Sequence, residues 1–121
     1  MRGTKTNKEY GRVLEEYVAQ LFRDLGIDEH ARPTKASGAK GEAGDVQQKY
    51  FVVECKARET KDAKIVRDVW VKNKDRIPLS SKRMPLLVVS NNEGRKWAVL
   101  DLDEFMHIFK KSLEAENGKE S

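Results

Sequence analysis

The sequence predicts a single α/β domain in which a mixed β-sheet is flanked by helices. Three observations support this fold class: an amphipathic helix near the N-terminus, an alternating segment over residues 50–57, and a pair of apolar segments within residues 85–100. The 121 residues suffice for one domain of ordinary size and not for two, so we treat 1–121 as one unit. We expect residues 1–5 and the polar tail from about 114 to 121 to be poorly ordered.

The first helix is predicted to begin at Thr6, which forms a capping-box pair with Glu9, and to end at Gly26. Its apolar residues recur every three or four positions and predict one buried stripe, made of Tyr10, Val13, Leu14, Tyr17, Val18, Leu21, Phe22 and Leu25. Glu15 lies at the edge of this stripe, whereas Glu16 belongs to the exposed row. A carboxylate at position 15 is therefore expected to point along the flank of the domain.

A hairpin of two strands is predicted over residues 45–57, after a short strand near residues 28–32 and a glycine-rich loop over residues 33–44. In the second hairpin strand the side chains alternate between faces. One face carries Phe51, Val53, Cys55 and Ala57, and the other carries Tyr50, Val52, Glu54 and Lys56. Cys55 is expected to be a small buried hydrophobic residue.

The second half of the chain predicts a helix, two antiparallel strands and a final helix. The first of these helices spans about residues 62–76, with Ile65, Val66, Val69 and Trp70 facing inward and Pro78 ending it. Trp70 has two interpretations, a core residue or a platform for base stacking. Residues 85–90 and 96–100 form the strands, and the final helix carries Leu102, Phe105, Met106, Phe109 and Leu113.

The charge distribution separates the middle of the chain from the rest. The formal net charge is +4, but residues 61–96 carry ten basic and four acidic side chains, a net charge of +6. This pattern favours a polyanion-binding face, with a solvated lysine-rich surface as the alternative. The sequence has no apolar run of membrane-spanning length, no signal-peptide core and one cysteine. These features predict no membrane and a cytoplasmic location, nucleoid-associated or in the host cytoplasm if the protein is viral.

The residues that indicate chemistry are Asp45, Glu54 and Lys56. Glu54 and Lys56 are two positions apart on one strand, so they project from the same face about 7 Å apart. If the hairpin strands pair, Asp45 and Glu54 can converge, and two converging carboxylates repel unless a cation separates them. Hard oxygen ligands select Mg²⁺, with Mn²⁺ able to substitute, and Lys56 could orient or deprotonate a water molecule. The alternative is an ordinary surface salt bridge between Glu54 and Lys56.

Gly44-Asp45, followed after eight residues by Glu54-Cys55-Lys56, resembles the PD-(D/E)XK nuclease superfamily, and the chain is similar to archaeal and phage-type Holliday junction resolvases over residues 8–109. The resemblance implies a restriction-endonuclease-like fold and an acidic metal-site residue on the first helix, which aligns with Glu15. Gly44 stands where the motif has proline.

The resemblance also implies a DNA-binding surface on the chain. The mobile loop of the family matches residues 32–44, and its leading basic residue is either Arg32 or Lys35. The DNA-contact candidates are Arg32, Lys35, Ser37, Lys40, Lys72 and Lys74. The family implies that Glu15, Asp45 and Glu54 bind metal and that Lys56 joins them as the fourth catalytic residue.

The implied function is a Mg²⁺-dependent endodeoxyribonuclease that resolves four-way junctions as a homodimer. Two alternatives stay open. One is a phage or mobile-element nuclease of the same superfamily that cuts flaps, single strands or duplex DNA. The other is a nucleic-acid-binding module with a degenerate site.

Overall fold

The strands form one five-stranded mixed sheet in the order β1-β2-β3-β4-β5. The computed structural model describes residues 7–35, 44–58 and 67–120. The strands are β1 (Arg32–Pro33), β2 (Val46–Gln47), β3 (Phe51–Ala57), β4 (Met84–Ser90) and β5 (Lys96–Val99). Only β3 and β4 pair in parallel, while the three other neighbouring pairs are antiparallel. The predicted α/β class and the predicted β2–β3 hairpin are therefore confirmed.

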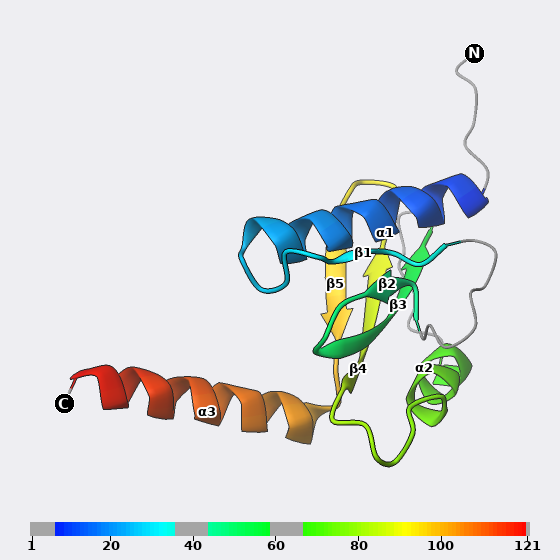
Figure 1. Cartoon of the computed structure of the whole chain (residues 1–121). Helices are drawn as coiled ribbons and strands as arrows, with labels where there is room; N and C mark the ends of the chain where they lie inside the picture. Colours follow the sequence, from blue (N-terminus) through cyan, green and yellow to red (C-terminus); the bar gives the residue numbers. More distant parts are fainter. Residues whose placement is uncertain (1–6, 36–43, 59–66, 121) are drawn as a thin grey trace.

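The described helices are α1 (Asn7–Asp24), α2 (Arg67–Asp75) and α3 (Leu102–Glu120). Helix α1 crosses one face of the sheet and contacts β1, β2 and β3, while α2 contacts β3 and β4 (Figure 1). Of the helix predicted over about residues 62–76, residues 62–66, including Ile65 and Val66, lie outside the described residues, and α2 covers most of the remainder. Among the described residues no helix is long and apolar enough to cross a membrane.

The core lies between α1 and the sheet. On the α1 side, Phe22 packs against Phe51 with ring centroids 6.2 Å apart, and Val53 and Cys55 are buried with them. The alternate β3 residue, Val52, is buried on the opposite side, where α2 covers the sheet. The predicted assignment of β3 side chains to two faces is confirmed, including the inward orientation of Cys55.

The buried stripe of α1 is narrower than the sequence predicts. Leu14, Val18 and Phe22 are buried, together with Ala19, which the apolar pattern did not include. Four predicted members are exposed instead: Val13, Tyr17, Leu21 and Leu25. The reason is that, among the described elements, no helix covers the sheet beside α1 over β4 and β5. This flank of α1 is therefore open, although Lys96 Nζ of β5 lies 4.1 Å from the centroid of the Tyr17 ring.

The C-terminal end of α1 and the first strand show how local sequence determines the fold. Gly26 has φ +71°, and the Ile27 amide donates to the Phe22 carbonyl, which ends α1 in a Schellman-type turn as predicted. The strand predicted over residues 28–32 is wrong for residues 28–31. There the Asp28 carboxylate accepts a hydrogen bond from the His30 amide and closes a turn. Only Arg32 and Pro33 join the sheet.

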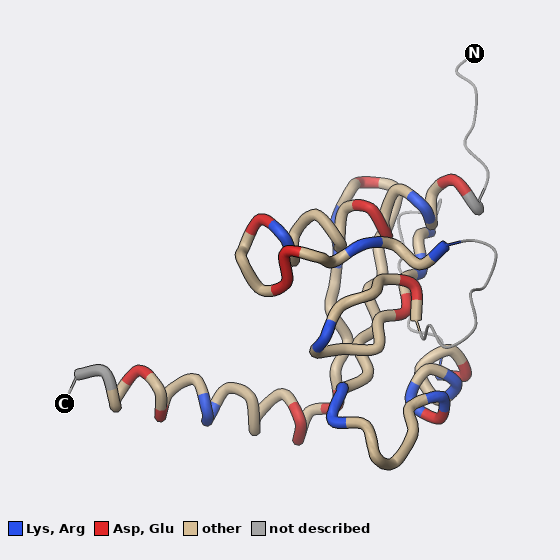
Figure 2. The backbone as a smooth tube through the Cα atoms, in the orientation of Figure 1, with Lys and Arg blue, Asp and Glu red and all other residues tan. Residues whose placement is uncertain are grey.

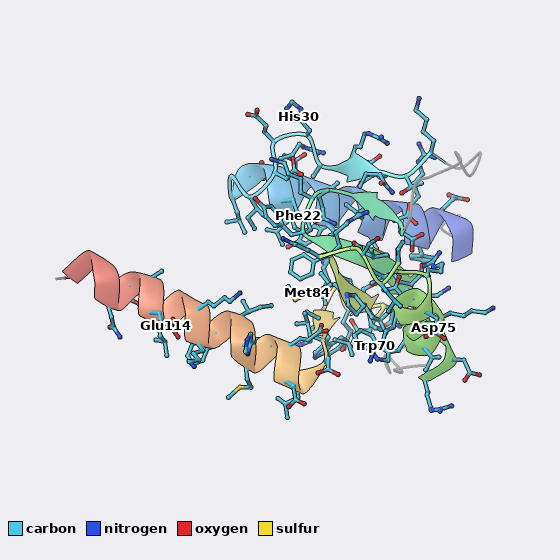
Figure 3. The ribbon with its side chains drawn as sticks, turned by 60° about the horizontal axis from the view of Figure 1, so that its bottom comes forward. Phe22, His30, Trp70, Asp75, Met84 and Glu114 are labelled. Carbon is cyan, nitrogen blue, oxygen red and sulfur yellow. The ribbon has the colours of Figure 1, made fainter. Side chains whose placement is uncertain are left out.

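Helix α3 departs most from the expectation. It continues to Glu120, so the predicted disorder of residues 114–120 is wrong, while residues 1–5 and Ser121 lie outside the described residues. At the start of this polar end, Lys110 and Glu114 form an ion pair four positions apart, which favours the helix. Instead of covering the sheet, α3 projects away from it, with Glu114 far from the strands (Figures 1 and 3).

Candidate functional site

Gly44 brings the backbone into close contact with the central strand just before Asp45. Its φ is +83°, and a Cβ added there would lie 2.7 Å from the Val53 carbonyl oxygen and 2.9 Å from the Val53 nitrogen. Proline is fixed near φ −65°, and other side chains would clash with β3. Glycine at position 44 is therefore required by the local geometry of this chain.

Asp45 is held against β3 by its backbone and by its side chain. Its amide donates to the Val53 carbonyl at 2.6 Å, and its Oδ2 accepts from the Cys55 amide at 2.8 Å. Val46 is the register partner of Val53, so Asp45 occupies the mouth of the β2–β3 ladder. This arrangement fixes the Asp45 carboxylate beside Glu54, as the hairpin predicts.

Glu54 lies on β3, and its side chain is 17% exposed. Burial raises its pKa from 4.5 to about 7, helped by a hydrogen bond to the Asp45 carboxyl group and by repulsion from the Asp45 charge. Arg76 and Lys56 act in the opposite direction and lower the pKa of Glu54. At neutral pH the Glu54 carboxyl group is therefore divided between its protonated and ionised forms.

Glu15 approaches the same aspartate from α1. Burial and, to a smaller extent, the nearby Asp45 charge together raise the pKa of Glu15 from 4.5 to about 7. Glu16 is exposed, as its place in the outer row predicts. Asp45 is thus the common neighbour of two carboxyl groups, one on a helix that covers the sheet and one on the central strand.

Lys56 completes the predicted group as a half-buried residue on the same strand face as Glu54. The structure thus brings Glu15, Asp45, Glu54 and Lys56 into one electrostatically coupled region. Burial, together with the charges of Asp45, Glu15 and Glu54, raises the pKa of the Cys55 thiol. Oxygen donors of this kind suit Mg²⁺ or Mn²⁺. Within residues 7–35, 44–58 and 67–120, no set of three acidic, histidine or cysteine side chains is already gathered tightly enough to hold an ion.

The sequence analysis missed Arg76 and Asn73, which connect the end of α2 to the site. Arg76 donates to Glu54 Oε1 at 2.9 Å and to Asn73 Oδ1 at 3.1 Å. Asn73 is fully buried, and its Nδ2 donates to the Val52 carbonyl at 3.0 Å. The sequence did contain one signal for Asn73. Val69 and Ile77 lie four positions before and after it, and this spacing predicts an apolar residue at position 73.

The predicted DNA contacts lie at two places. Arg32 and Lys35 are exposed beside the base of the glycine-rich loop, where the Thr34 hydroxyl donates to the Gly44 carbonyl at 2.7 Å. Ser37 and Lys40 lie outside the described residues. On α2 the two lysines at positions 72 and 74 are exposed and follow Arg67 along a basic helix (Figure 2). Trp70 on the same helix is half-buried and lies beside the sheet (Figure 3).

No protein-family model matches the chain, and no curated protein or solved structure is significantly similar to it. The function therefore has to be argued from the site itself.

Proposed function

We propose that this chain is a Mg²⁺-dependent DNA endonuclease of restriction-endonuclease-like fold whose substrate is the four-way junction. The observation that carries the proposal is the coupling of Glu15 and Glu54 to Asp45, with the pKa of both glutamates raised to about 7. Buried carboxyl groups that repel one another are what a cation site requires before its ion binds. Lys56 on the same strand face supplies a proton-transfer or orienting group.

Asp45 and Glu54 would hold Mg²⁺, and Glu15 would complete the site directly or through water. When bound, Mg²⁺ offsets the negative charge of the phosphodiester and acidifies a coordinated water molecule. The chain's own residues do the positioning. The Cys55 amide holds the Asp45 carboxylate, and Glu54 is mostly buried on β3. Lys56 Nζ would orient the attacking water as an ammonium donor, or accept its proton only as a neutral amine.

The exposed basic residues near the site would bind the DNA backbone. Lys72 and Lys74 extend along α2, and Arg32 and Lys35 lie at the loop base next to Asp45. Contacts of this kind orient a duplex without reading its sequence. A four-way junction has two-fold symmetry and needs two cuts, so a homodimer with two sites would match it.

One observation favours a second candidate, a DNA-binding module without catalysis. The Arg76 guanidinium already satisfies one oxygen of Glu54. A guanidinium could take the place of the metal ion and leave a site that recognises DNA but does not cut it.

The experiment that separates these candidates is a cleavage assay on labelled four-way junction, flap, single-stranded and linear DNA, with Mg²⁺ and with chelator. Cleavage of the junction in preference to the other substrates supports the resolvase proposal. Cleavage of a different substrate supports the broader nuclease, and tight binding without Mg²⁺-dependent cleavage supports the binding module.

A further inference from the structure

Helix α3 carries an apolar stripe that nothing in the described chain covers. The stripe consists of Leu102, Phe105, Met106, Phe109 and Leu113, whose side chains are between 45% and 70% exposed. The rings of Phe105 and Phe109 stack at 6.5 Å along it. Helices in water owe most of their stability to the packing of such a face. An exposed stripe of this length therefore indicates a docking surface.

The same chain has an uncovered apolar groove beside α1. It has a volume of about 380 Å³ and lies between the second half of α1 and strands β4 and β5. Its walls include Tyr17, Leu21, Leu25 and Ile27, each at least 44% exposed. Leu86 and Val88 of β4 form its floor. A helix seated there would lie beside α1 on the same face of the sheet, in the layer arrangement typical of α/β domains.

The connection between β5 and α3 keeps the stripe away from the groove of its own chain. Leu100 packs against the core, and Asp101 Oδ1 caps α3 by accepting from the amides of Asp103 and Glu104. A different side of α3, which carries Glu104 and Ile108, faces the rest of the domain at Met84. Seating the stripe in its own groove would require α3 to turn within two residues and lose these contacts.

We propose that α3 docks in the groove of a second copy of this chain, so that two chains exchange their C-terminal helices in a symmetric dimer. The 19 residues of α3 span about 28 Å. Two reciprocal contacts, each about 28 Å long and about 10 Å wide and counted on both surfaces, bury about 1,100 Å², just above the roughly 1,000 Å² that a biological interface should exceed. Each copy offers one helix and one groove, so a two-fold symmetric arrangement closes the exchange after two chains, whereas a head-to-tail arrangement would extend into longer assemblies. The proposal depends only on these two surfaces and not on nuclease activity.

The first test is the mass of the full chain without DNA, measured by sedimentation equilibrium at micromolar concentrations. A dimer has about twice the 13.9 kDa chain mass. Phe109→Glu on the stripe and Leu21→Glu in the groove should each weaken dimerisation at least about tenfold. Ala115→Glu introduces the same charge on the other side of α3 and should leave the dimer intact. All three sites are exposed, and circular dichroism checks that the variants remain folded.

The second test identifies what occupies the groove. A chain carrying Leu21→Cys is mixed with a chain carrying Phe109→Cys and treated with a short bismaleimide, while the native Cys55 is buried in both. Exchange predicts a cross-link between the two kinds of chain. A monomeric wild type, a dimer unaffected by Phe109→Glu, or Phe109→Cys chains that cross-link only to one another would each overturn the proposal. The last result would show that α3 pairs with α3 instead.

Discussion

The Arg76 guanidinium donates a 2.9 Å hydrogen bond to Glu54 Oε1 and thereby joins the end of α2 to the central strand at the candidate site. The buried Asn73 holds the same guanidinium through a second hydrogen bond. The Arg76 charge therefore offsets part of the repulsion that Asp45 exerts on Glu54. This ion pair has to rearrange, or share Glu54, when a metal ion binds.

Arg76→Ala should strengthen Mg²⁺ binding because it removes a cation that competes for Glu54. We expect an increase of about fivefold, equivalent to the roughly 1 kcal/mol of a partly exposed ion pair. Titration calorimetry measures the effect. Arg67→Ala is the matched control, since Arg67 is an exposed α2 residue whose ion pair is with Asp68. Weaker Mg²⁺ binding by the Arg76 variant would show that the guanidinium supports the site instead of competing for it.

The stability of the metal-free protein should fall as the pH rises from about 4.5 to about 7. The pKa values of Glu15 and Glu54 are about 7 in the folded chain and near 4.5 when unfolded, so folding retains protons across this interval. Their contribution is complete below the lower value and is lost as the pH rises through the higher one. Thermal melting in chelator measures the trend.

Glu54→Gln isolates this effect from other titrating groups. The melting temperature of the variant, relative to wild type, should increase steadily between pH 4.5 and pH 8, because glutamine carries no charge to repel Asp45. A difference that stays constant with pH would mean that Glu54 titrates normally. Mg²⁺ at pH 8 should restore stability to the wild type and have little effect on the variant.

Gly44→Ala should destabilise the protein by about 2–4 kcal/mol, because the alanine must adopt a positive φ and its Cβ meets the Val53 carbonyl. Gly44→Pro should be at least as damaging, because proline cannot adopt a positive φ. Denaturant unfolding measures both. Gly11→Ala is the control: nothing lies within 4 Å of its added Cβ, and in a helix the change should stabilise by about 0.5–1 kcal/mol. A neutral Gly44→Ala would mean that the loop base is not held against β3.

Glu15→Gln should lower DNA cleavage by about 10- to 100-fold, the range for a group that supports metal ligands. Glu16→Gln should stay close to wild type, because Glu16 is exposed on the neighbouring position of the same helix. Single-turnover rates on the four-way junction compare the two variants directly. A larger loss of cleavage in Glu16→Gln than in Glu15→Gln would show that Glu16, and not Glu15, is the functional carboxylate of α1.

The local parts of this fold could be predicted from sequence. The alternation of side chains along β3 assigned Glu54 and Cys55 to opposite faces, and Gly26 was correctly predicted to end α1. Both predictions depend only on residues close together in the sequence. The edge position of Glu15 followed from the helical repeat, whereas its proximity to Asp45 is a result of the structure.

Tertiary placement could not be predicted in the same way. Arg76 reaches Glu54 across 22 positions, and no local pattern reports such a contact. The α1 stripe was predicted too wide because an apolar side chain shows the same repeat whether it meets its own sheet or a groove left uncovered. For the same reason, the apolar repeat of α3 predicted which side of the helix is apolar, but not that the helix projects away from the sheet.

The central claim is that Asp45, Glu54 and Lys56 form a metal-dependent hydrolytic site, and cleavage of a labelled four-way junction by wild type and Lys56→Ala tests it most directly. We predict paired, symmetric nicks by the wild type in Mg²⁺, none in chelator, and at least about a 100-fold loss in the variant with junction binding retained. Equal rates for the two proteins in Mg²⁺, or no cleavage of the junction by the wild type, would contradict the account.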